Sequence, residues 1–254
     1  MSTASASLQD SAIMLRRNFK HTVRNPVTVF NAVLFPIIMM LMFVFIFGGG
    51  FKVAGNYVDY AVPGLLVMAV TYGLGPTATE VNGDLTKGVI NRFKAMDVSR
   101  GAVMNGHVAA TTVRALIAVA AIIGVGFAIG FRPHAGAVQW LAVIGLVLLL
   151  AFATSWLTVA LGLAAKTPES AGMGTVPLIM LPFLSSAFVP ASTMKPGVKQ
   201  FVEYQPFTPI IETLRALLGG HGPTAGNAIA AVAWCVAFAV LGYFWSVSTF
   251  EKRA

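Results

Sequence analysis

Six long apolar stretches run through this chain of 254 residues, and only short polar segments separate them. Each stretch has about the 20 residues that an α-helix needs to cross the roughly 30 Å hydrocarbon core of a bilayer. Nothing between them is long enough to fold into a soluble catalytic domain. The sequence therefore predicts an all-α membrane protein, one domain over residues 1–254, with spans at 27–48, 59–80, 107–130, 138–162, 171–190 and 226–249.

Charged residues make up only 10% of the chain, against about 25% in a typical soluble domain. The net charge of +8, taken alone, suggests nucleic acid as a partner. Its distribution favours a membrane surface instead, because Lys and Arg gather in particular loops between the apolar stretches. We therefore expect a lipid bilayer, and no nucleic acid, among the partners.

Lys and Arg are concentrated on one side of the predicted spans. They are most frequent before span one and between spans two and three, and the loops of the opposite side hold fewer. An excess of these residues is typical of cytoplasmic loops. The sequence therefore predicts a multi-pass protein of the plasma membrane with both termini in the cytoplasm, and an even number of spans agrees.

A basic segment precedes the first span. Residues 8–24 have apolar positions at near-helical spacing, and Pro26 follows them. Such a helix can lie in the inner interface with its cations near anionic lipid. A basic patch that only sets the topology is the alternative. We expect an interfacial helix whose basic residues are Arg16, Arg17, Lys20 and Arg24.

Spans two and five contain the residues that kink or weaken helices. Span two holds Pro63, Gly73 and Pro76, and span five holds Pro177 and Pro182. Paired irregular spans favour a moving pathway, whereas a purely structural role for the prolines and ordinary packing of the methionines are the alternatives. The possible pathway residues are Met68, Tyr72, Pro76, Met173, Pro177, Met180 and Phe183.

The longest predicted cytoplasmic loop has helical potential over residues 84–96. Asp84 suits the N-terminal cap or the first turn of such a helix. An apolar ridge with cations on its other faces predicts a docking element for another protein, and a helix lying on lipid is the alternative. The ridge consists of Leu85, Val89, Phe93 and Met96, at spacings of four, four and three residues.

The stretch 191–220 is too short and too interrupted to span, so we expect two short helices in the outer leaflet before span six. Pro206 and Pro209 separate them. Glu212 and Arg215 are three residues apart and can pair on one helical face, which lowers the cost of placing charge near lipid.

One cation is predicted to lie inside the membrane. Arg114 lies two turns inside span three, where it can extend its head to the interface or pair with Glu80 at the inner end of span two. A proton-driven carrier is expected to have an acid near mid-span, and the predicted spans contain none. This weighs against autonomous secondary transport.

The sequence has no sign of nucleotide or metal chemistry. It lacks the G-x-x-x-x-G-K-[ST] pattern of a phosphate-binding loop. Its four histidines are scattered without zinc-type spacing, and Cys235, in the last span, is typical of a small core hydrophobe. We expect a chain that is not itself an enzyme and binds no metal or cofactor.

Two local patterns resemble the membrane subunits of type-2 ABC exporters, of the daunorubicin-resistance permease kind found in actinobacteria. The resemblance covers nearly the whole chain. Two positions depart from the family pattern: Asp97 stands where the family usually has Pro, and Gln205 where it has Asn. The patterns are Asp84-Leu85-x-x-Gly88-x-x-x-Arg92-Phe93-x-x-Met96 and Gln205-Pro206-x-Thr208-x-x-x-x-x-Leu214-Arg215-x-Leu217-x-x-Gly220.

This resemblance implies an exporter of two permease chains and two copies of a separate ATP-binding subunit. The second permease is identical or a sister chain, and ATP and Mg are held by the ATPase. The segment 84–96 would be the coupling helix in a cleft of the ATPase, and the external motif would include Pro206, Glu212 and Arg215. The residues implied in ATPase coupling are Asp84, Leu85, Gly88, Val89, Arg92, Phe93, Met96 and Asp97.

Three functions remain open on the sequence alone. The first is the permease of an ATP-driven exporter that moves an amphipathic drug, natural product or lipid outward. The second is a carrier driven by a proton gradient, and the third is a membrane anchor subunit that transports nothing. The resemblance and the missing phosphate-binding loop favour the first.

Overall fold

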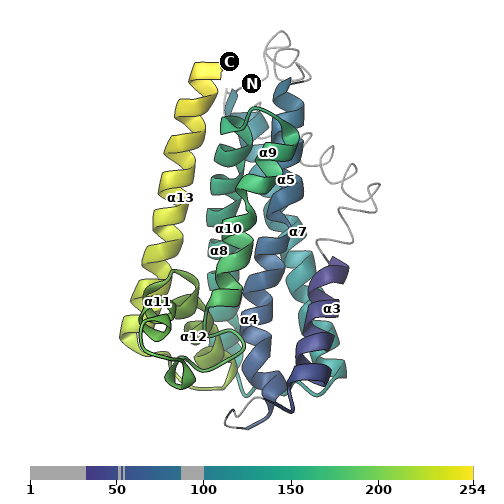
Figure 1. Ribbon diagram of the computed structural model, residues 1–254, viewed down its shortest axis with the longest axis vertical. Helices are drawn as coiled ribbons and strands as arrows, with labels where there is room; N and C mark the ends of the chain where they lie inside the picture. The colour runs from purple at the N-terminus through teal and green to yellow at the C-terminus, as the bar shows by residue number, and fades with distance from the viewer. Residues whose placement is uncertain (1–32, 51–52, 54, 87–99, 254) are drawn as a thin grey trace.

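The structure is a computed structural model that describes residues 33–50, 53, 55–86 and 100–253. This part of the chain is mostly helical, without a strand, so the all-α prediction is confirmed for it (Figure 1). The helices are α3 (Phe35–Leu41), η2 (Met42–Phe47), α4 (Tyr57–Tyr72), α5 (Leu74–Thr86), α7 (Arg100–Ala128), α8 (Ala137–Ala164), α9 (Pro168–Gly174), α10 (Val176–Met180), η3 (Leu181–Leu184), η4 (Ala191–Thr193), α11 (Val198–Tyr204), α12 (Phe207–Leu218) and α13 (Ala225–Arg253).

Among the described residues, four helices are long and apolar enough to cross a membrane. They cover Tyr57–Thr86, Val103–Ala128, Ala137–Ala164 and Ala225–Lys252, which correspond to predicted spans two, three, four and six. The shorter apolar helix Phe35–Phe47 falls in predicted span one, whose first residues lie outside the described ones. The total of six spans therefore stays a prediction.

Residues 171–190 do not form the single helix that the sequence predicts. Instead α9, α10 and η3 follow one another, and the backbone after Leu184 is no longer helical. Pro177 and Pro182 each lie at the start of a new helical piece, because proline lacks the N–H and its ring collides with the preceding turn. These pieces still run along the bundle from α9 toward α11 and α12 (Figure 1).

The bundle has two ends, which we name after the short helices found there (Figure 1). The α9 end holds α9, the last turn of α5 and the C-terminal end of α13. The α12 end holds the first turn of α4, the turn at residues 129–136, α11 and α12. The predicted topology assigns the α9 end to the cytoplasm.

The long helices pack closely where glycine faces a neighbour. A Cβ at Gly242 of α13 would lie 2.5 Å from the backbone nitrogen of Leu157 in α8, so a larger residue would push these helices apart. The outer face of α13 remains apolar and exposed, with Ile229, Leu241 and Phe244 each more than half accessible. Such a surface is typical of a helix that faces lipid.

Candidate functional site

The break in the predicted fifth span places an irregular backbone inside the bundle. We call residues 185–188 the buried turn, since all four are buried and none is helical. Ser185 stabilises it locally: its hydroxyl donates to the carbonyl of Pro182 and accepts the backbone N–H of Ala187 at 3.1 Å. The carbonyls of the turn point away from any helical ladder, so they need donors from elsewhere.

Side chains from α4 and α12 supply those donors. The Tyr60 hydroxyl donates to the carbonyl of Ser186 at 2.9 Å, and the Tyr57 hydroxyl donates to that of Phe188 at 3.4 Å. Arg215 Nη2 donates to the carbonyl of Ser186 at 2.8 Å and to that of Ala187 at 3.4 Å. Two segments distant in sequence thus supply donors to the carbonyls of Ser186, Ala187 and Phe188.

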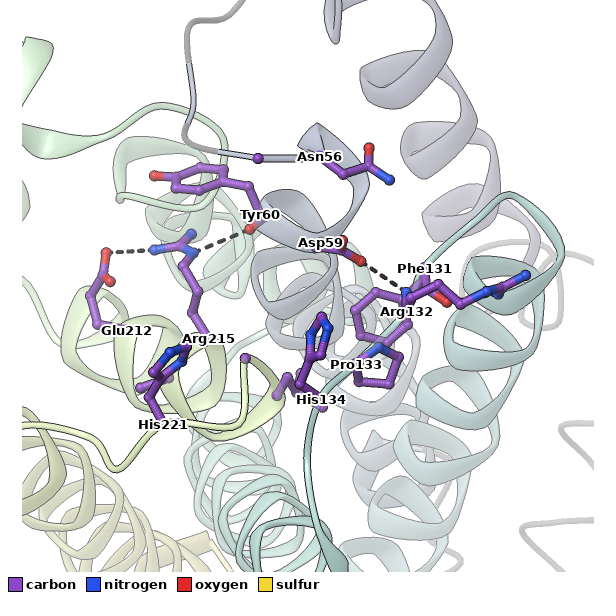
Figure 2. Close-up of a pocket in the computed structure, with 14 residues that line it drawn as sticks. Asn56, Asp59, Tyr60, Phe131, Arg132, Pro133, His134, Glu212, Arg215 and His221 are labelled. Atoms are coloured by element: carbon purple, nitrogen blue, oxygen red, sulfur yellow. Dashed lines mark hydrogen bonds and ion pairs between the residues drawn. The ribbon is translucent and has the colours of Figure 1, made fainter.

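Arg215 also binds α4 and its own helix (Figure 2). Its Nη1 donates to Glu212 Oε1 at 2.6 Å, so the predicted pair on α12 is confirmed. Its Nε donates to the carbonyl of Tyr60 at 3.2 Å, and the guanidinium carbon lies 3.8 Å from the centroid of the Tyr60 ring. We call Tyr57, Tyr60, Glu212 and Arg215 the Arg215 cluster.

The sequence of α12 explains why Arg215 points into this position. Pro206 is the residue before the helix, and the amide of Gln205 donates to the Thr208 hydroxyl at 3.0 Å near its start. The apolar positions Phe207, Ile210, Ile211 and Leu214 are fully buried. Glu212 and Arg215 border this apolar side and are only partly buried, and Arg215 extends to α4 and to the buried turn.

A hollow of about 430 Å³ adjoins the cluster at the α12 end, between α4, the turn at 131–134 and α12 (Figure 2). Asp59 Oδ1 accepts the backbone N–H of Arg132 at 2.9 Å, and the Arg132 guanidinium donates to the carbonyls of Phe127 and Phe131 at the end of α7. His134 and His221 also line the hollow. No group of three or more His, Cys, Asp or Glu suited to a metal occurs within the described ranges.

Two further polar contacts between side chains lie between α5 and α7, closer to the α9 end. Arg114 is buried and lies 3.2 Å from Glu80, and its Nη2 donates to the Thr77 hydroxyl at 2.8 Å. Of the two predictions for Arg114, pairing is thus the one seen. Asp84 Oδ2 lies 3.3 Å from His107 Nε2.

The predicted coupling segment is only partly visible. Asp84 and Leu85 belong to the last turn of α5, which continues to Thr86, so the prediction that Asp84 begins a separate helix is wrong. The helix that continues past this residue packs along α8 and α9. The other predicted coupling and interfacial residues lie outside the described ranges: Gly88, Val89, Arg92, Phe93, Met96, Asp97, Arg16, Arg17, Lys20 and Arg24.

The predicted pathway residues do not form one group. Tyr72 and Phe183 meet edge to face, with ring centroids 6.4 Å apart. Met173 and Met180 are exposed, Met173 to 73%. They lie on residues 168–184, which we call the broken segment because α9, α10 and η3 follow one another there, and so do the exposed Val176 and Leu184. Met68 is fully buried in the core. Pro76 lies just after the boundary between α4 and α5, and Pro177 starts α10.

Sequence reasoning missed Tyr60 and Asn82. The Asn82 amide donates to the carbonyls of Gly162 and Ala165, at 2.9 and 2.8 Å, and so caps the end of α8. No local signal marked Asn82, because it lies just past the predicted end of span two among other polar residues, and its burial depends on packing against α8. For Tyr60, the signal was its place one turn before Pro63, in the first turns of a span that also holds Asp59.

Comparison with known proteins gives consistent matches. Residues 10–218 match the family described as ABC-2 type transporter. The chain is 33% identical over 231 residues to the daunorubicin resistance ABC transporter permease protein DrrB1 of Streptomyces coeruleorubidus, covering 89% of this chain and 78% of that protein. It is 27% identical over 232 residues to the probable doxorubicin resistance ABC transporter permease protein DrrC of Mycobacterium tuberculosis, covering 87% of this chain and 83% of that one.

Proposed function

The chain belongs to the ABC-2 type transporter family, and on that premise we propose that it exports an amphipathic drug, natural product or lipid with energy from a separate ATPase subunit. It is a membrane permease of an ABC exporter and not itself an enzyme. The observation that carries the proposal is the match over residues 10–218, together with two relatives named for resistance to daunorubicin and doxorubicin.

We propose that the partners are two copies of an ATP-binding subunit and a second permease, identical or a sister chain. ATP and Mg bind to the ATPase. The segment 84–96 docks in that subunit, and Asp84, at the end of α5 beside His107, connects this segment to the bundle. Both termini are cytoplasmic in this arrangement, as is the α9 end.

The surface of the broken segment supports a pathway between two permeases. Met173, Val176, Met180 and Leu184 follow one another at spacings of three and four residues and are all exposed. Flexible Met side chains adapt to ligands of different shape. We propose that this surface and Tyr72 with Phe183 contact the substrate, and that Met68 supports them from the core.

Transport by inside-out vesicles tests the proposal, with doxorubicin as the probe. Vesicles that contain the chain and its ATPase should accumulate doxorubicin when ATP is added, and a proton ionophore should not prevent it. A matched preparation with a hydrolysis-deficient ATPase should accumulate none. Uptake that needs a proton gradient and proceeds without ATP would identify a secondary carrier instead.

A further inference from the structure

The buried turn is held in place by side chains rather than by a backbone ladder. Its carbonyls bind Tyr57, Tyr60 and Arg215, which belong to α4 and α12. A helix moves as one body because its hydrogen bonds are internal. A turn whose bonds lead to neighbouring helices can change position when those few bonds break.

The buried turn approaches α4 most closely at Gly64, which lies against Ala187. A Cβ at Gly64 would lie 2.5 Å from Ala187 Cβ and 2.8 Å from Ala187 Cα, so only glycine lets the turn approach this far. Beside it, Phe188 stacks on Phe43 of η2, with ring centroids 3.7 Å apart. The turn is therefore seated between α4, α12 and the π-helical η2.

One group in the turn is left without a bond in this position. The Ser186 hydroxyl is fully buried and has no hydrogen-bond partner among the described residues. Leaving a buried hydroxyl unpaired disfavours the arrangement that contains it. The seated position thus combines strong external bonds with one unmet group, as expected for a position that is occupied during only part of a cycle.

On the basis of the function proposed above, we propose that Arg215 and Tyr60 are positioning residues of the transport cycle, forming a releasable latch that seats the buried turn against Gly64 of α4. When the latch is closed, the buried turn is fixed at the α12 end, and the helical pieces that precede it, α9, α10 and η3, cannot shift along the bundle. Release exchanges the bonds from Arg215 and Tyr60 to the Ser186 carbonyl for other partners and uncovers Ser186.

Thiol labelling of Ser186 tests this directly. In a Cys235→Ala background, Ser186→Cys places one thiol at a site that is 0% exposed. We expect slow reaction with N-ethylmaleimide in the purified complex with its ATPase. Arg215→Gln or Tyr60→Phe should raise the labelling rate about fivefold, the factor that a free energy on the order of one hydrogen bond gives.

Two surface changes at the same end serve as matched controls. Lys199→Gln removes a cation that also pairs with a glutamate, at 3.7 Å from Glu203, and that takes no part in the bonds from Tyr57, Tyr60 and Arg215 to the buried turn. Tyr204→Phe removes the hydroxyl of an exposed tyrosine on α11. Both should leave labelling unchanged. Equal labelling rates in Tyr60→Phe and Tyr204→Phe would overturn the latch, even where Arg215→Gln fails to assemble.

Adding ATP separates a latch from a merely structural contact. With Tyr60 and Arg215 intact, hydrolysis by the complex should raise the labelling rate of Ser186→Cys, and Arg215→Lys should give a rate between those of Arg215 and Arg215→Gln. A rate that ATP leaves unchanged, in a complex that hydrolyses ATP, contradicts the latch alone. A chain that neither binds an ATPase nor supports its activity contradicts the proposed function itself.

Discussion

The Arg215 cluster at the α12 end and the Arg114–Glu80 pair between α5 and α7 each join an arginine to a glutamate, but they stabilise different parts of the structure. Between α5 and α7, Arg114 pairs with Glu80 and a hydroxyl, so the contact joins side chains of two regular helices. At the α12 end, Arg215 pairs with Glu212 of its own helix, and its other N–H groups donate to the backbone carbonyls of Tyr60 and Ser186. The difference shows that a charge near the membrane can support either helix packing or a broken backbone.

The largest expected effect is at Arg114, which is only 4% exposed. Arg114→Met removes the cation that lies 3.2 Å from Glu80 and should lower the free energy of unfolding by about 3–5 kcal/mol. Adding Glu80→Gln should recover most of this loss, because the carboxylate charge is then removed together with the guanidinium. SDS titration of the purified variants in detergent micelles measures both changes, and a double variant as unstable as the single one would show that the pair is not the main contact.

The matching change at Arg215 should behave differently. Arg215→Met should cost about 2–3 kcal/mol, because the charge-assisted bonds to Glu212 and to the Ser186 carbonyl are lost. Adding Glu212→Gln should recover little, since the backbone carbonyls still lack the guanidinium. The same titration provides the measurement. Recovery equal to that at Arg114 would mean that the ion pair, and not the backbone, is what Arg215 stabilises.

Substitutions at two glycines compare the same two regions, with smaller expected losses in the free energy of unfolding. Gly64→Ala crowds Ala187, and Gly162→Ala crowds the Ala78 carbonyl at 2.8 Å on the α5 side of α8. Each should destabilise by about 1–3 kcal/mol, as overpacking does. Only Gly64→Ala should speed the labelling of Ser186→Cys. Equal labelling in the two variants would show that the turn is not seated on Gly64.

The smallest effect is expected at the exposed Lys199–Glu203 pair on α11. Both side chains are nearly half accessible and their charged atoms are 3.7 Å apart. Lys199→Gln should change the free energy of unfolding by less than about 0.5 kcal/mol. A larger loss in the SDS titration would place α11 in a contact that the described residues do not contain.

Local patterns in the sequence predicted those features that depend on local spacing. Length and apolarity identified four long helices, and a separation of three residues identified the pair of Glu212 with Arg215. Arg114 was left with two options because pairing depends on how α5 and α7 pack.

Features that depend on tertiary contacts were beyond the sequence. The prolines indicated an irregular fifth span, but the donors for its carbonyls come from residues 29 and 126 positions away in the chain. Asp84 is a residue type that often starts a helix, yet it lies in the last turn of α5, a helix that packs along α8 and α9. Packing between distant segments decides such cases, and no local pattern carries that information.

Co-purification of the full chain with its candidate ABC ATPase tests the central claim most directly. We expect the two to elute together, with a mass that fits two permeases and two ATPases, and with ATP hydrolysis that depends on the permease. A chain that purifies without an ATPase and moves doxorubicin under a proton gradient would contradict the account.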